Sequence, residues 1–283
     1  MMYNNDSFNS TVAMSNRDFS RLKDFIYNEC GINMVESKRT MLEARLQKRL
    51  RKLNLKSFSN YCDYLFSQEG IQDEMTDMIN EVTPNKTDFF REPGHFEYLT
   101  CKALPELTLT KKNIYVWSAG CSSGEEPYTL AMVLKEYSSS NRAFNFLILG
   151  TDISTNVLDK ARMAVYDQER INPVPHEFKK KYLLKSKDKV KKLYRITPEL
   201  RETVRFRRLN FMDGDFGFRE PMDIIFCLNV IIYFDKSTQE KLLNKFCKYL
   251  SPDGYLFVGH SETLFGMNVP LKQVAPTIYR RSL

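Results

Sequence analysis

The chain has 283 residues, of which 42% are hydrophobic and 27% charged, and its formal net charge is +7. These values are ordinary for a globular protein with material for one large domain or two modest ones. The longest apolar runs, Ile224–Leu228 and Val230–Tyr233, are far too short to cross a bilayer, and the polar N-terminus has no signal-peptide pattern. We therefore expect a cytoplasmic protein that is not inserted in a membrane.

The cysteines and histidines follow no metal-binding pattern. Six cysteines are scattered without a CxxC pair, and the three histidines are His95, His176 and His260. Structural zinc sites usually show closely spaced Cys and His ligands. The sequence therefore predicts reduced cysteines that pack in the core, and no bound metal.

The first part of the chain has a helical pattern. Residues 1–16 are predicted to be flexible, and residues 17–98 to form a small all-helical N-terminal domain. In the latter, strand-like alternation is absent and apolar residues recur at helical spacing. Examples of this spacing are Phe19, Leu22, Phe25, Ile26, Met41, Leu42, Leu46 and Leu50.

A basic cluster lies within this helical region. Its members are Lys38, Arg39, Arg45, Lys48, Arg49 and Lys52. Such clustering indicates an acidic partner, which can be a nucleic acid, an anionic lipid or an acidic protein surface. The alternative is a solvated helix face without a partner.

Residues 99–283 alternate strand-like and helical segments. This alternation is typical of an α/β domain with a mostly parallel sheet and helices on both faces. Residues 165–204 interrupt this alternation of strands and helices and are predicted to form a small inserted β-subdomain. The predicted strands are Tyr115–Trp117, Phe146–Asp152, Phe206–Asn210, Asp223–Cys227, Tyr255–Gly259 and an edge strand at Thr277–Arg281.

The loop after the first of these strands favours a nucleoside ligand with a cationic end. Gly120 and Gly124 let the backbone turn sharply and approach a ligand closely. Glu125 and Glu126 then open a helix, where two carboxylates would repel a phosphate. S-adenosylmethionine, with its sulfonium and ammonium groups, is such a ligand. A simple tight turn is the alternative.

Polar residues follow three further strands, and ligands bind beyond the carboxyl ends of strands in this class of sheet. Asp152 would accept hydrogen bonds from ribose hydroxyls, or cap the next helix. Asn210 would supply a polar edge and Phe211 an apolar wall for adenine, or begin an ordinary loop. Asn229 lies in an apolar run that also contains Tyr233. Its side-chain amide must form hydrogen bonds, either with a ligand or within the core.

One more cluster precedes the sheet, in the segment Asn85-Lys-Thr87-Asp-Phe-Phe-Arg91. Its adjacent phenylalanines could cap a pocket while the polar groups reach a ligand carboxylate. The alternative is a helix start whose phenylalanines pack in the core between domains.

In their order along the chain, these segments resemble the CheR-type chemoreceptor glutamate methyltransferases. The similarity spans residues 17–280. It implies a helical N-terminal domain followed by a Rossmann-like class I methyltransferase domain that carries the inserted β-subdomain. The matching segments are Thr83–Glu92, Val116–Tyr128, Gly150–Ser154, Asn210–Phe211, Cys227–Asp235 and Pro252–Glu262.

The resemblance implies S-adenosylmethionine as methyl donor, S-adenosylhomocysteine as product and no metal. We further expect catalytic roles for Arg91, which would orient a carboxylate, and for Tyr233, which would line the methyl-transfer site. At Leu228 the family usually carries an arginine, so one contact to a carboxylate is expected to be absent here. The implied cofactor contacts come from Asn85, Thr87, Arg91, Gly120, Glu125, Glu126, Asp152, Asn210, Phe211, Leu228 and Asn229.

The implied substrates are glutamates on the cytoplasmic methylation helices of chemoreceptors. These helices would dock on the basic cluster, and a receptor C-terminal peptide would bind the inserted β-subdomain. Two alternatives are a CheR-like binding protein with weak or no transferase activity, suggested by Leu228, and a nucleic-acid methyltransferase. The second fits the positive charge, but Asn229-Val-Ile-Ile does not match the Asn/Asp-Pro-Pro-Tyr motif of base amino methyltransferases. We therefore expect no nucleic-acid partner.

Overall fold

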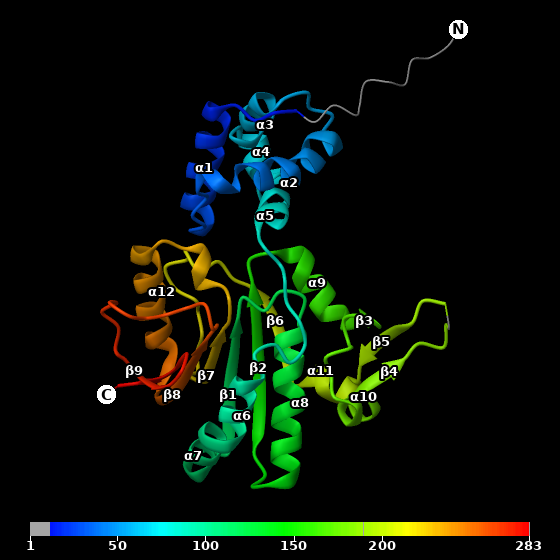
Figure 1. Ribbon diagram of the computed structural model, residues 1–283, viewed down its shortest axis with the longest axis vertical. Coiled ribbons are helices and arrows are strands. Elements are labelled where there is room, and N and C mark those ends of the chain that lie inside the picture. The colour runs from blue at the N-terminus through cyan, green and yellow to red at the C-terminus, as the bar shows by residue number, and fades with distance from the viewer. Residues whose placement is uncertain (1–11, 189, 283) are drawn as a thin grey trace. The chain divides into compact units, whose positions relative to one another are not determined.

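The computed structural model describes residues 12–188 and 190–282, which form two compact units that divide between Pro84 and Asn85 (Figure 1). The sequence prediction placed this division after residue 98. Residues 85–98 instead belong to the second unit, because Phe89 and Phe96 lie in its hydrophobic core. Most of the predicted flexible N-terminus lies outside the described residues; within them, Met14 is buried.

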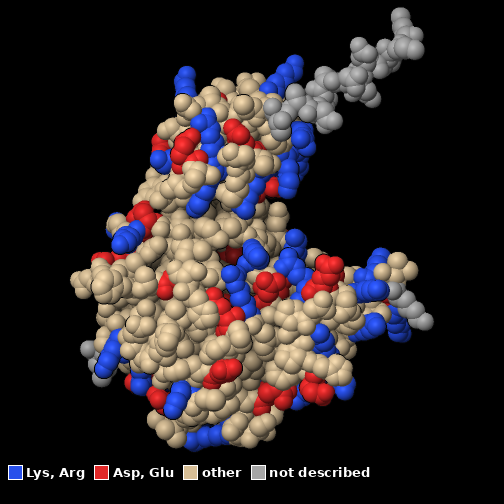
Figure 2. All heavy atoms as spheres, in the orientation of Figure 1, with Lys and Arg blue, Asp and Glu red and all other residues tan. Residues whose placement is uncertain are grey.

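The first unit is helical throughout its regular structure, as predicted. Ser15, Ser57 and Ser67 each accept a hydrogen bond from a backbone N–H of the following turn, which fixes where three helices begin. Lys and Arg side chains are frequent on the face of this unit that Figure 2 presents. Its elements are α1 (Asn16–Cys30), η1 (Glu36–Lys38), α2 (Arg39–Lys52), α3 (Phe58–Leu65), α4 (Gln68–Asp73) and α5 (Met75–Val82).

A buried ion pair joins α2 to the start of α5. The Arg49 guanidinium donates to both carboxylate oxygens of Glu74 at 2.8 and 2.6 Å, and the Tyr61 hydroxyl donates to the same carboxylate at 2.9 Å. Arg49 is only 6% exposed. Removing one member of such a pair leaves an uncompensated buried charge. Arg49 therefore serves the fold of this unit rather than the basic surface predicted to include it.

The second unit is built on a seven-stranded sheet in the order β6-β2-β1-β7-β8-β10-β9. The first five strands in this order are parallel to one another. Only β10 runs in the opposite direction, antiparallel to both β8 and β9. The order reverses beside β1, which is where ligands bind in such sheets. The strands are β1 (Asn113–Ala119), β2 (Asn145–Asp152), β6 (Val204–Arg208), β7 (Met222–Cys227), β8 (Leu250–Val258), β9 (Leu271–Ala275) and β10 (Ile278–Arg281).

Helices precede and connect these strands and complete the predicted α/β architecture. They are α6 (Pro93–Tyr98), η2 (Leu99–Ala103), α7 (Leu104–Thr110), α8 (Glu125–Ser140), α9 (Thr155–Met163), η3 (Ile231–Tyr233) and α12 (Lys236–Tyr249). Among the described residues, no helix combines the length and apolar character that crossing a membrane requires.

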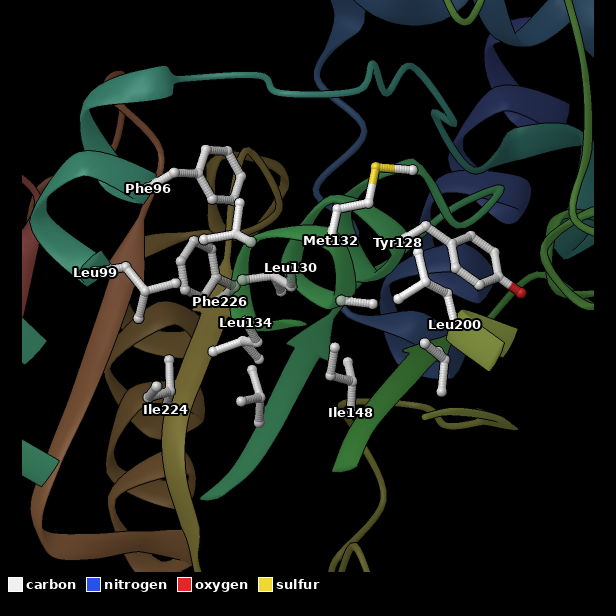
Figure 3. Close-up of a cluster of buried hydrophobic side chains, with 14 of the residues drawn as sticks. Phe96, Leu99, Tyr128, Leu130, Met132, Leu134, Ile148, Leu200, Ile224 and Phe226 are labelled. Atoms are coloured by element: carbon white, nitrogen blue, oxygen red, sulfur yellow. The ribbon is translucent and has the colours of Figure 1, made fainter. Parts of the chain in front are cut away.

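The core lies on both faces of the sheet because successive strand residues point to opposite faces. On one face, Leu130 and Leu134 of α8 lie over the strands, and Phe96 stacks on Phe226 at a ring distance of 5.9 Å (Figure 3). On the other face, the buried Trp117 ring meets Phe246 of α12 at 4.8 Å. This packing holds the strand ends, and the loops that follow them, in fixed positions.

Residues 165–196 form a second, three-stranded antiparallel sheet in the order β3-β5-β4. Its strands are β3 (Val165–Asp167), β4 (Leu183–Lys185) and β5 (Leu193–Ile196), with α10 (His176–Tyr182) before β4. The helix α11 (Pro198–Glu202) then leads back into the main sheet at β6.

Candidate active site

The loop after β1 approaches the loop after β7. Gly120 has a φ of 82°, and a Cβ atom there would lie 2.5 Å from a methyl group of Val230. A side chain at this position would therefore clash with the neighbouring loop. The N–H groups of Gly120 and Cys121 both donate to the Thr151 carbonyl, which attaches this loop to the end of β2 as well.

Asp152 joins the loop after β1 to the start of α9. One carboxylate oxygen accepts from the Ser122 N–H and the other from the Ser154 N–H, each at 2.9 Å. Burial raises the pKa of Asp152, while these amide hydrogen bonds favour its ionised form. An ionised carboxylate accepts about four hydrogen bonds. Asp152 thus organises two loops and has the acceptor capacity that the predicted ribose contact needs.

The two glutamates that open α8 have different environments. Glu125 is buried, accepts from the Ser123 hydroxyl at 2.7 Å and lies 3.7 Å from the Arg170 guanidinium. Glu126 accepts from the Ser118 hydroxyl at 2.6 Å. Burial raises the pKa of Glu126 to about 7, and the nearby carboxylates of Glu92 and Glu262 add to that rise. Glu126 is therefore a carboxylate that a bound cation would stabilise.

The segment predicted to cap the site lies against the same loop. The Asn85 carbonyl accepts from the Ser122 hydroxyl at 3.0 Å, and the Thr87 carbonyl accepts from Arg170 at 2.8 Å. Arg91 donates to the Lys86 carbonyl at 3.2 Å, and its charge lowers the pKa of Glu126.

Two neighbours of Arg91 have strained backbones. Phe90 and Glu92 have φ values of 54° and 58°, which are unfavourable for residues with a side chain. The Phe90 ring contacts Phe96 and the Phe90 N–H donates to Thr129, and these contacts offset the strain.

The loop after β7 is held by one carboxylate. Glu262, 5% exposed, accepts hydrogen bonds of 2.5 to 3.3 Å from five backbone N–H groups. Burial raises the pKa of Glu262, against the opposing effect of these amides. The five donors are the N–H groups of Asn229, Val230, Ile231, Ile232 and Gly259.

These hydrogen bonds to Glu262, which we call the Glu262 clamp, hold Asn229 in an unusual conformation. Its φ is 58°, and its side-chain Oδ1 is buried without a hydrogen-bond partner. A buried orphan acceptor is rare and calls for an explanation such as a ligand. Tyr233 follows in η3 and is half-buried, whereas Leu228 packs in the hydrophobic core.

The third strand-end pair, Asn210 and Phe211, follows β6 and is half-buried. The Asn210 side chain accepts from the Met212 N–H at 3.0 Å. Phe211 meets the rings of Phe246 at 5.6 Å and Trp117 at 6.3 Å. The structure thus places an aromatic face and an amide together beyond the end of β6.

The structure adds residues that the sequence reasoning gave no role. Glu262, Ser118, Ser122 and Arg170 supply the hydrogen bonds and the ion pair described above. Glu262 follows the buried strand β8, so the strand-end argument that singled out Asp152 and Asn229 applies to it equally.

Both units match family models. Residues 85–280 match the model described as "CheR methyltransferase, SAM binding domain", and residues 17–83 match "CheR methyltransferase, all-alpha domain". The chain is also similar to curated proteins over nearly its whole length.

Three of these relatives illustrate the similarity. The chemotaxis protein methyltransferase of Borreliella burgdorferi is 42% identical over 288 residues, covering 100% of both chains. Chemotaxis protein methyltransferase 2 of Pseudomonas aeruginosa is 37% identical, covering 96% of this chain and 95% of its own. The chemotaxis protein methyltransferase of Escherichia coli is 35% identical, covering 96% and 93%.

The raised pKa of Glu126 predicts a specific pH dependence of stability. The native state keeps this proton up to about pH 7, whereas an ordinary glutamate loses it near pH 4.5. The native state therefore binds more protons between these values, and stability falls as the pH rises through them. In Glu126→Gln, we expect this fall to shrink by on the order of 1–3 kcal/mol, allowing for partial exposure.

Urea unfolding of ligand-free protein at several pH values measures this difference, with the exposed Glu97→Gln as the control. Equal pH dependence in wild type, Glu97→Gln and Glu126→Gln would show that Glu126 titrates normally.

Proposed function

Since the chain belongs to the CheR methyltransferase family, we propose that it transfers a methyl group from S-adenosylmethionine to glutamate carboxylates of chemoreceptors. The products are a glutamate methyl ester and S-adenosylhomocysteine. The observation that carries the cofactor assignment is the buried, unpaired Oδ1 of Asn229 at the switch point of the sheet. It is an acceptor that lacks a donor within the protein, and the amino groups of the cofactor are donors.

Glu126 supports the same assignment at the other end of the ligand. Glu125 already has the Arg170 guanidinium beside it, so Glu126 is the better partner for the cofactor's ammonium. A cation there would favour the ionised form of Glu126 and offset the effect of burial. Glu126 is thus the part of the site that selects a cationic ligand.

The remaining contacts follow from the positions of the strand-end loops. We assign Asn85, Thr87 and Arg91 to the methionine end of the cofactor, and Asp152 to the ribose. Asn210 and Phe211 would provide the edge and the wall of the adenine pocket. Leu228 lies in the hydrophobic core, so any contact it makes with the cofactor is apolar.

The methyl transfer requires little from the protein beyond positioning the methyl donor and the receptor carboxylate. S-adenosylmethionine supplies a methyl carbon activated by the sulfonium, and a receptor glutamate is already ionised at neutral pH. No general base is needed, which fits a site built from amides, hydroxyls and carboxylates. Arg91 would orient a carboxylate through its forked donors, and Tyr233 would line the transfer site. Alignment within about 3–3.5 Å and exclusion of water then account for the rate.

We propose that the receptor's acidic helices dock on the basic cluster of the first unit. Lys48 and Lys52 of α2 are the exposed members of this cluster. Their ion pairs, Lys48 with Glu81 at 3.6 Å and Lys52 with Asp77 at 3.3 Å, are solvent-exposed and so contribute little energy. Lys38, Arg39 and Arg45 are half-buried, and Arg49 is buried.

We also propose that β4, at the edge of the three-stranded sheet, pairs with a receptor C-terminal peptide by strand addition. Lys185, Lys187 and Lys192 line a hollow beside this strand together with Asp188, and the excess of positive charge would attract the peptide's carboxylate.

The alternative functions are less well supported. The relatives of high identity are named chemotaxis protein methyltransferases, which favours neither a nucleic-acid substrate nor a binding protein without activity. A cytoplasmic location follows as a proposal from the proposed substrate, because the methylated helices of chemoreceptors are cytoplasmic.

The first test measures transfer of radiolabelled methyl from S-adenosylmethionine to chemoreceptor. We expect Arg91→Ala to lower kcat/KM by about 100-fold, because it removes charge-assisted hydrogen bonds to a carboxylate. We expect a smaller loss, about tenfold, for Tyr233→Phe. Arg142→Ala, at an exposed arginine of the same unit, is the control. Wild-type turnover in both test variants would remove these residues from the active site.

The second test addresses docking. The double variant Lys48→Glu/Lys52→Glu should raise the KM for receptor about tenfold and weaken its salt dependence, with kcat at saturation unchanged. The charge-matched control is Lys102→Glu/Lys160→Glu, which reverses two exposed lysines of the second unit. An equal effect of both double variants would indicate net charge rather than a docking surface.

A further inference from the structure

Glu92, His95 and His260 lie in two segments of the candidate active site, but none of them is assigned to the cofactor. Glu92 precedes α6, His95 lies within α6, and His260 follows β8. The Glu92 Oε2 atom is 3.4 Å from the His95 Nδ1 atom and 4.0 Å from the His260 Nδ1 atom. One ligand atom from each residue lies within 4.8 Å of the others. Three potential metal ligands therefore face a common point.

Two of these atoms lack the partners that buried polar groups need. His95 is 2% exposed, and its Nδ1 atom makes no hydrogen bond. The Glu92 Oε2 atom is also buried without a hydrogen-bond partner. Buried polar atoms are nearly always satisfied, so an unpaired carboxylate oxygen beside an unpaired ring nitrogen points to a missing cation.

Thr277 provides a partner for the other ring nitrogen of His95. Its hydroxyl lies 2.8 Å from the His95 Nε2 atom. With a metal ion on Nδ1, the ring proton would lie on Nε2, and the Thr277 hydroxyl would accept it. Metal-bound histidines usually donate their other ring nitrogen to an oxygen in this way.

In contrast to the absence of a bound metal that the sequence predicts, we propose that Glu92, His95 and His260 bind a divalent transition-metal ion, with Zn²⁺ as the metal that fits best. In tetrahedral sites Zn²⁺ lies about 2.0–2.1 Å from nitrogen or oxygen ligands, which places those ligands about 3.4 Å apart. The Glu92–His95 separation has this value, and rotation of the exposed His260 side chain would bring it to the same distance.

Such an ion would tie together two segments of the proposed active site. Glu92 follows Arg91 directly, and His260 lies two residues before Glu262, which clamps the Asn229 loop. The His260 N–H already donates to the Glu92 carboxylate at 3.3 Å, so the two segments are in contact without the ion. The metal would therefore stabilise an existing arrangement, and its role is structural.

The test uses Co²⁺ as a spectroscopic probe on full-length protein without a histidine tag. We expect wild type to bind one equivalent of Co²⁺ with the visible absorption of a tetrahedral site, and Zn²⁺ to displace it and raise the Tm. His260→Ala should weaken Co²⁺ binding by at least about tenfold, and Thr277→Val by about 10- to 100-fold.

The control is His176→Ala, which removes the third histidine, an exposed residue outside the cluster. It should bind Co²⁺ as wild type does. The proposal is overturned if wild type binds no stoichiometric Co²⁺, or if His260→Ala binds it as tightly as His176→Ala. The first result would mean that the cluster holds a proton between Glu92 and His95 instead of a metal, and the second that Co²⁺ binds elsewhere.

Discussion

The candidate active site depends on the convergence of five backbone N–H groups on the carboxylate of Glu262. Burying an ionised carboxylate is costly unless its oxygens accept hydrogen bonds, and both oxygens of Glu262 accept from backbone N–H groups. The same bonds satisfy the backbone of a loop that enters neither helix nor strand at Asn229. Without Glu262, these N–H groups would need water, and the positive φ of Asn229 would lose its support.

The other loops depend on this clamp through direct contact. Val230 packs against Gly120, which leads into α8, and Asp152 ties that loop to the end of β2. In this arrangement Glu126 lies near the carboxylates of Glu92 and Glu262, and Arg91 is the nearby positive charge. Such a site is electrostatically incomplete by itself, and a ligand that brings an ammonium and a sulfonium would complete it. This is the physical sense in which the fold fits S-adenosylmethionine.

The sequence could predict the architecture because it depends on local patterns. The alternation of strand-like and helical segments predicted a mostly parallel sheet. Polar residues directly after buried strands indicated Asp152 and Asn229 as candidate site residues. It could not show that Arg49 is buried on Glu74, because a charged residue on a helix normally faces water. Nor could it show His95 beside His260, since this contact arises only when distant segments pack together. The edge strand β9 was also not predicted, because its residues are mostly exposed and lack the alternation of apolar and polar residues that marks a half-buried strand.

The most direct test of this account is the affinity of Glu262→Gln for S-adenosylhomocysteine, measured by calorimetry. A glutamine offers one acceptor and places an N–H₂ group against backbone donors, so the Asn229 loop should lose its conformation. With folding verified by circular dichroism and the exposed Glu220→Gln as control, we predict at least about a tenfold loss of affinity, which is about 1.4 kcal/mol. Wild-type affinity in folded Glu262→Gln would contradict the central role of this carboxylate.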